Sequence, residues 1–143
     1  MPLFLLLSLA ASAAVQPAAV ADAPGPRCEW SEKWRALPLP SFGPEARLVG
    51  PQLKKGRIGL PRPKHPRTIE GRWVAQVAID AKGRTVDAQM IERPRVSPPW
   101  PEAEEHMLAA ARKLRWQPAT ADGRPVPVCM DLPVFSSPRR IDR

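Results

Sequence analysis

The sequence predicts an α+β fold: a small antiparallel sheet of three strands, formed in the order hairpin, helix and strand, with one helix packed on one face and a Pro-rich extension ahead of it. Two observations predict this fold. The chain has 20 prolines in 143 residues, yet none lies from Arg67 to Arg93 or from Glu102 to Gln117, and proline interrupts helices and sheet ladders. Apolar residues recur at every second position in the first window and at helical spacing in the second.

The first Pro-free window predicts a β-hairpin. In its first strand, four apolar side chains at alternate positions lie on one face: Trp73, Ala75, Val77 and Ile79. Asp80-Ala81-Lys82-Gly83 supplies a turn, since Asp opens turns and Gly accepts a positive φ. Alternation resumes over residues 85–92, with Val86, Ala88 and Met90 on one side. We therefore expect a hairpin with one half-buried face.

The second window predicts a helix that begins at Trp100-Pro101, because proline is favoured at the first helical position. Acidic residues fill its first turn and basic residues its last turn, which suits the helix dipole. An apolar stripe, expected to cover the hairpin, comprises Ala103, Met107, Ala110, Ala111 and Leu114. After an Asp122-Gly123 turn, alternating apolar residues from Val126 to Val134 predict the third strand.

Residues 1–21 predict an export signal. Leu3 to Ala11 is an apolar run broken only by Ser8, and Ala19-Val20-Ala21 has the small-x-small form of a signal-peptidase site. No Lys or Arg precedes the run, which leaves an uncleaved membrane anchor as the alternative. In either case we expect the remainder of the chain to be exported.

Residues 22–66 predict a Pro-rich basic spacer. Prolines recur there among lysines and arginines, which favours an extended, polyproline-like chain with solvated charges. Contact of these charges with anionic lipid or cell-wall polymer is the alternative. Within residues 28–35, Trp30 and Trp34 stand four residues apart and predict a short helix that packs back on the domain. At the other end, residues 137–143 predict a frayed, solvated basic tail.

Cys28 and Cys129 are the only cysteines, and an exported chain permits them to form a disulfide. Two separate thiols are the alternative. A loop of about 100 residues closed by such a bond contributes up to about 4.7 kcal/mol in the chain-entropy model. The sequence has no Cys-x-x-Cys or His-x-x-x-His spacing, and His65 lies far from His106. We therefore expect no metal site and no cofactor.

Neither an enzyme nor a nucleic-acid-binding protein is expected. Glu104, Glu105 and His106 could supply an acid or a base, but no nucleophile elbow, metal motif or Gly-rich phosphate loop accompanies them. The net charge of +8 favours an anionic partner. Tryptophans that could stack on bases lie among arginines, but each has a structural position in the hairpin or at a helix end: Trp73, Trp100 and Trp116.

Three short motifs occur in a fixed order. They are Gly71-Arg72-Trp73-Val74 leading into Ile79-Asp80-Ala81-Lys82-Gly83-Arg84, Ala109 to Leu114 leading into Arg115-Trp116-Gln117-Pro118-Ala119, and Asp122-Gly123-Arg124-Pro125-Val126. Together they resemble the C-terminal domain of TonB, the periplasmic energy transducer of Gram-negative bacteria. That family shows a Gly-x-Val strand, an Asp-x-x-Gly-Arg turn and an aromatic-x-Pro-Ala step. The match covers about Glu70 to Phe135, and we assign residues 67–136 to this domain.

The resemblance implies a protein-binding domain without catalysis or cofactor. In the family, a sheet edge takes up an extended segment of an outer-membrane transporter by strand addition. We therefore expect partner binding at the last strand and the helix exit, through Val128, Cys129, Met130, Asp131, Leu132, Arg115 and Trp116. Pro127 and Pro133 fall at the same alternate positions as Cys129 and Asp131, so only Cys129 and Asp131 keep outward donors. Strand addition at this edge should therefore be short or weak, and the prolines equally fit protection of the edge against aggregation.

One departure from the family bears on function. Its energy-coupling members keep an uncleaved N-terminal helix with a His that engages a proton-driven membrane motor, whereas residues 2–21 contain no His. We therefore expect a periplasmic, non-enzymatic module that binds an envelope protein such as an outer-membrane transporter. The alternatives are a TonB-type energy transducer, anchored in the inner membrane and facing the periplasm, and a basic envelope protein that binds anionic surfaces.

Overall fold

Antiparallel strands make up most of the regular structure of the described residues, which also form two helices. The computed structural model describes residues 28–134 and 139–141. The helices in this part of the chain are α1 (Glu32–Arg35) and α2 (Pro101–Arg112). The strands are β1 (Leu48–Val49), β2 (Gln52–Lys55), β3 (Arg67–Glu70), β4 (Val74–Ile79), β5 (Thr85–Glu92), β6 (Arg95–Ser97), β7 (Arg115–Gln117), β8 (Ala119–Ala121), β9 (Arg124–Val126), β10 (Val128–Pro133) and β11 (Arg139–Ile141). The predicted α+β class is confirmed, whereas the predicted signal or anchor segment lies outside the described residues.

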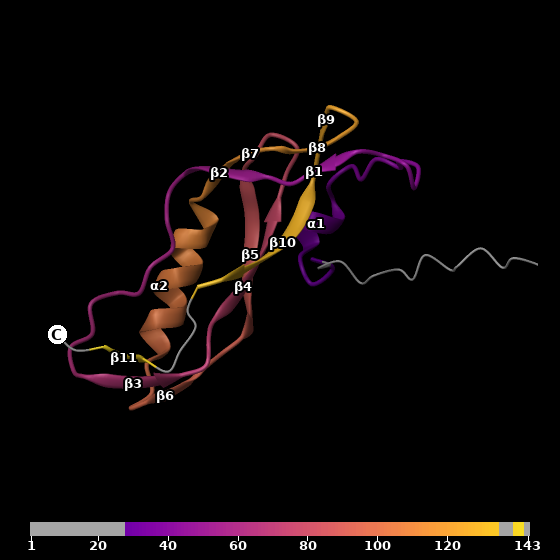
Figure 1. Ribbon diagram of the computed structural model, residues 1–143. Coiled ribbons are helices and arrows are strands. Elements are labelled where there is room, and N and C mark those ends of the chain that lie inside the picture. The colour runs from indigo at the N-terminus through magenta and orange to yellow at the C-terminus, as the bar shows by residue number, and fades with distance from the viewer. Residues whose placement is uncertain (1–27, 135–138, 142–143) are drawn as a thin grey trace, which may run out of the picture.

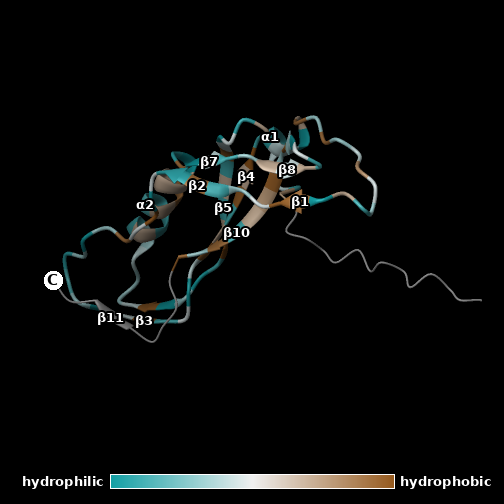
Figure 2. Cartoon of the chain, turned by 45° about the horizontal axis from the view of Figure 1, so that its top comes forward, coloured by the Kyte–Doolittle hydropathy of each residue, from teal (hydrophilic) through white to brown (hydrophobic). Residues whose placement is uncertain are grey.

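The central sheet has the strand order β10-β4-β5 (Figure 1). Val77 of β4 lies opposite Met130 of β10 on one side and Ala88 of β5 on the other. The Asp80-Gly83 turn joins β4 to β5, as the sequence predicts, and the Gly83 N–H donates to the Asp80 carbonyl at 3.0 Å. Figure 2 shows hydrophobic residues along β4 and β10, beside the hydrophilic β2. Strands β10, β4 and β5 therefore form the sheet against which the rest of the described chain packs.

Helix α2 covers one face of the central sheet through Ala103, Met107 and Ala111, which are buried. Ala110 of the predicted stripe is only half-buried, and Leu114 is buried just beyond the helix end. The segment from β2 to β3 runs alongside α2 (Figure 1) and adds apolar side chains to the same core. The main core thus lies between the sheet, α2 and this segment.

The opposite face of the central sheet is covered by the chain around α1. Trp30 and Trp34 pack there against Ala78, and α1 contacts β5, which agrees with the short helix predicted within residues 28–35. As a result, every residue of β4 is buried. The prediction of a hairpin with one half-buried face is therefore wrong for β4, because a segment remote in sequence closes the second face.

Small sheets flank the central sheet at both ends (Figure 1). At one end, β1 pairs with β8, β8 with β9, and β2 with β7; at the other, β3 lies between β11 and β6. A single three-stranded sheet therefore does not describe the chain. The prediction of an extended spacer over residues 22–66 is wrong for β1 and β2, which pair with β8 and β7. Short runs between the prolines keep their backbone N–H groups and can therefore form these ladders. Likewise, residues 139–141 of the tail predicted to fray form β11.

Candidate functional site

Strand β10 forms an edge of the central sheet and pairs, among the described strands, only with β4. The Val134 N–H donates to the Trp73 carbonyl at 2.9 Å. Because backbone groups point to alternate sides along a strand, the even-numbered residues of β10 bond to β4. The backbone N–H and C=O groups of Cys129 and Asp131 therefore point away from β4, outward from the edge of the sheet. Pro133 is also an outward-facing position, but it has no N–H.

At the opposite edge of the sheet, side chains cap the backbone at the centre of β5. Ala88 lies opposite Val77, whose backbone bonds to β10, so the backbone groups of Ala88 point away from β4. Its N–H donates to Asp87 Oδ1 at 3.0 Å, and its carbonyl accepts from Arg112 Nη2 at 3.2 Å. Ser31 Oγ donates to the second oxygen of Asp87 at 2.6 Å and holds this carboxylate in place. The backbone at the centre of β5 is thus capped, whereas none of the described strands other than β4 pairs with β10.

An apolar groove of about 190 Å³ adjoins β10 on the α2 side of the sheet. Leu53 of β2, which is 51% exposed, forms part of its wall. The remaining lining residues are Ile58, Leu114, Trp116, Leu132, Pro133 and Val134. An extended segment added to β10 would place alternate side chains over this groove.

The structure brings together some of the residues predicted for partner binding and separates others. Leu132 and Trp116, both predicted for partner binding, line the same groove. Trp116 is only 6% exposed, and its Nε1 donates to Thr85 Oγ1 at 3.0 Å, so it forms the floor of the groove. Arg115 does not line the groove; it is exposed beside Lys54 and Lys55 in a basic hollow of about 380 Å³.

The turn after β4 fixes the position of Trp116. Gly83 has φ of +80°, its carbonyl accepts the Trp116 N–H at 2.8 Å, and a Cβ there would collide with the Trp116 carbonyl oxygen. Asp80 Oδ1 accepts the N–H groups of Lys82 and Arg84, both at 2.9 Å. Burial alone would raise the pKa of Asp80, but these bonds and the Arg84 guanidinium outweigh it and hold the pKa below its ordinary value.

A disulfide ties the N-terminal segment to β10 on the face opposite the groove. Cys28 and Cys129 are bonded, with 5.6 Å between their Cα atoms, which answers the question that the sequence left open. Beside it, Trp30 Nε1 donates to Gln76 Oε1 at 2.6 Å, and Gln76 Nε2 donates to Asp131 Oδ1 at 2.9 Å. The two residues of β10 with outward backbone groups are therefore fixed on the face opposite the groove. The disulfide fixes Cys129, and the hydrogen bonds from Trp30 through Gln76 fix Asp131.

Of the residues considered for acid–base chemistry, Glu104 has a structural partner, because it forms an ion pair with Arg93 at 2.7 Å. Within residues 28–134 and 139–141, no group of three or more His, Cys, Asp or Glu side chains is placed to hold a metal ion. The tryptophans considered for base stacking are all at least nine-tenths buried, namely Trp73, Trp100 and Trp116. Little of each ring is therefore exposed for stacking on a base.

Leu53 and Ile58 are groove residues that the sequence did not single out. Both belong to the stretch that its prolines and basic charges mark as a spacer, so their signal was only that they are isolated apolar residues. Gln76 was likewise missed, because a polar residue on the second face of a hairpin predicts exposure rather than a buried link between Trp30 and Asp131.

No protein-family model, curated protein or solved structure matches the chain. In the described part of the chain, neither helix has the length and apolar character needed to span a bilayer.

Proposed function

We propose that the chain is a periplasmic, non-enzymatic protein-binding module, resembling the TonB C-terminal domain, that binds an extended segment of an envelope protein such as an outer-membrane transporter. The observation that carries the proposal is the contrast between the two edges of the central sheet. The centre of β5 is capped by Asp87 and Arg112, whereas Cys129 and Asp131 direct backbone groups outward from β10. Strand addition needs such an open edge.

Docking on β10 depends on more than backbone hydrogen bonds. Only Cys129 and Asp131 offer outward N–H groups, and each net hydrogen bond contributes about 0.5–1.5 kcal/mol. Burial of one large aliphatic side chain adds about 1.5–3 kcal/mol, and the groove beside Leu53 and Leu132 offers such burial. We therefore expect a short extended segment with an apolar residue on the α2 side.

The disulfide supports an oxidising compartment for the protein. Bonds such as Cys28–Cys129 persist in oxidising environments and are rare in the cytosol, which supports export. The membrane-anchored energy transducer stays the alternative, because residues 1–21, which distinguish the two, lie outside the described part of the chain.

The test compares two substitutions at one position. Asp131→Pro removes an outward N–H and places a ring at the docking edge, but it takes no backbone hydrogen bond from β4, because the even-numbered residues of β10 make those bonds. Asp131→Ala keeps that N–H and loses the same side-chain bond to Gln76, so it is the matched control. Peptides that cover the periplasm-facing segments of envelope proteins encoded with the chain are screened, and the affinity of each binder is measured by calorimetry for both variants.

We expect Asp131→Pro to bind at least about tenfold more weakly than Asp131→Ala, which corresponds to about 1.4 kcal/mol. Bound peptide should also slow hydrogen exchange of the Cys129 and Asp131 amides in the unsubstituted chain. A peptide that binds both variants equally and leaves these amides unprotected would contradict strand addition at β10. Circular dichroism of both variants establishes that the fold is retained.

A further inference from the structure

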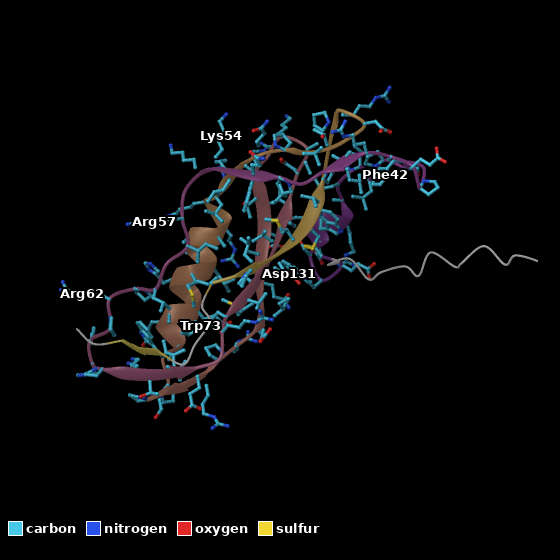
Figure 3. The ribbon with its side chains drawn as sticks, viewed as in Figure 1. Phe42, Lys54, Arg57, Arg62, Trp73 and Asp131 are labelled. Carbon is cyan, nitrogen blue, oxygen red and sulfur yellow. A yellow bond between two sulfur atoms is a disulfide. The ribbon has the colours of Figure 1, made fainter. Side chains whose placement is uncertain are left out.

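A second cavity lies at the other end of α2 from the groove. It occupies about 270 Å³ between residues 61–67, which lead into β3, and the first turns of α2. Arg62, Lys64 and Arg67 line it, together with the ring of Trp100. Figure 3 shows Arg62 on the outer side of the segment that passes α2. The cavity is therefore a basic hollow with an aromatic wall, on a part of the molecule that strand addition does not use.

The charges of the described residues that line this cavity do not balance. Its three basic side chains face one carboxylate, that of Glu102, which leaves two formal positive charges. Among the ion pairs within the described residues, none includes Arg62, Lys64 or Arg67. Mutual repulsion of like charges destabilises such a cluster unless an anion joins it.

Arg67 is the fixed member of the cluster. Its guanidinium carbon lies 5.2 Å from the centre of the Trp100 ring, and Nη1 donates at 2.6 Å to each of the Pro98 and Pro99 carbonyls. Among the described residues, all of these partners are neutral, and the buried Nε has no hydrogen-bond partner. A partly desolvated cation with such neutral partners is stabilised by an anion nearby. Arg62 and Lys64 are exposed and are free to close on that anion.

We propose that this cavity binds a phosphomonoester group. Such a group carries about −1.5 to −2 charges near neutral pH, which matches the two uncompensated positive charges. The volume is slightly below the range of about 300–1,000 Å³ that is usual for drug-sized ligands, so a compact head group fits better than a large ligand. His65 and His106 at the rim supply further ring N–H donors to phosphate oxygens. The group belongs either to a soluble metabolite or to a lipid.

The test uses the whole exported chain and a charge-matched control. Arg62→Gln/Lys64→Gln removes two exposed positive charges from the cavity, and Lys54→Gln/Lys55→Gln removes two from β2, away from it. Inorganic phosphate and glycerol 1-phosphate are titrated at physiological salt, and the Trp100 indole N–H signal is followed by nuclear magnetic resonance. In parallel, binding is measured to phosphatidylcholine vesicles with and without phosphatidic acid.

We expect the cavity variant to lose at least about tenfold in affinity, or about 1.4 kcal/mol, and the control variant to stay within a factor of about two. Binding to soluble phosphates identifies a soluble source, and binding to phosphatidic acid vesicles alone identifies a lipid source; either supports the site. An equal loss in both variants would show that diffuse charge attracts the anion and would overturn the proposal. So would the absence of binding to every probe.

Discussion

Replacement of both cysteines by alanine should remove a large part of the protein's stability. Cys28 and Cys129 are 101 residues apart in sequence, and closing a loop of this length restricts the unfolded chain by about 4.7 kcal/mol in the chain-entropy model. Measured losses are commonly about 2–4 kcal/mol. Because domains are stable by only about 5–15 kcal/mol, this one bond accounts for a substantial share. Alanine is chosen because both sulfurs are buried and a serine would bury a hydroxyl.

The structure also predicts which part of the fold opens first when the disulfide is removed. Apart from the disulfide, the segment around α1 is held to the sheet by the Trp30–Gln76 and Ser31–Asp87 hydrogen bonds and by two tryptophan side chains. In the double variant, this segment should open before the central sheet does. Its Leu37 N–H, bonded to the Trp34 carbonyl at 3.0 Å, should then exchange faster than the amides of β4.

Urea unfolding of the oxidised protein, the reduced protein and the Cys28→Ala/Cys129→Ala variant gives the free energies, and hydrogen exchange gives the order of opening. We expect the variant to lose about 2–4.7 kcal/mol relative to the oxidised protein, and the reduced protein to behave similarly. A loss below about 1 kcal/mol, or exchange that is unchanged around α1, would refute the reasoning.

Two further predictions concern the turn after β4. Gly83→Ala should destabilise the fold by about 3 kcal/mol, because about 1–2 kcal/mol for a left-handed alanine adds to a collision with the Trp116 carbonyl that costs about 1–3 kcal/mol. Gly123→Ala is its control, since that glycine has φ of +78° but nothing within 4 Å of a new Cβ; equal losses in urea unfolding would exclude the collision. The pKa of Asp80 is lower in the folded protein than its ordinary value of 3.8. The ionised carboxylate therefore contributes its full stabilisation at pH values above 3.8, and this contribution is lost as the pH falls through the pKa of the folded state. The stability gap between the unsubstituted chain and Asp80→Asn should therefore narrow in acid, and a gap that is constant from pH 7 to about pH 2 would contradict this.

The elements with long, regular patterns were predictable from sequence. Alternation over β4 and β5 and the stripe on α2 locate them, because each pattern places apolar residues on the face that contacts the main core. The small strands carry no such pattern: β1 has two residues, too few to show a period, and its pairing with β8 joins residues more than 70 positions apart. The burial of the second face of β4 depends on the Cys28 segment, so neighbours in sequence contain no sign of it.

The candidate site was predictable to a similar degree. Prolines at 127 and 133 fix which residues of β10 face outward, because proline cannot donate to a ladder. The groove, by contrast, needs Leu53 and Trp116 to lie side by side, and this depends on the pairing of β2 with β7. Arg115 alternates with Trp116 along β7 and therefore faces away from the groove.

The Cys28–Cys129 bond also determines how the molecule would carry mechanical tension. A pull applied to the chain ahead of Cys28, and resisted by a segment docked on β10, would pass through the disulfide directly into the docking strand. Helix α2, β5 and the flanking sheets lie outside this load path and would not be peeled apart. With the disulfide reduced, the same pull would first break the hydrogen bonds that hold the segment around α1 to the sheet. The tension would then reach β10 only along the backbone between Cys28 and Cys129.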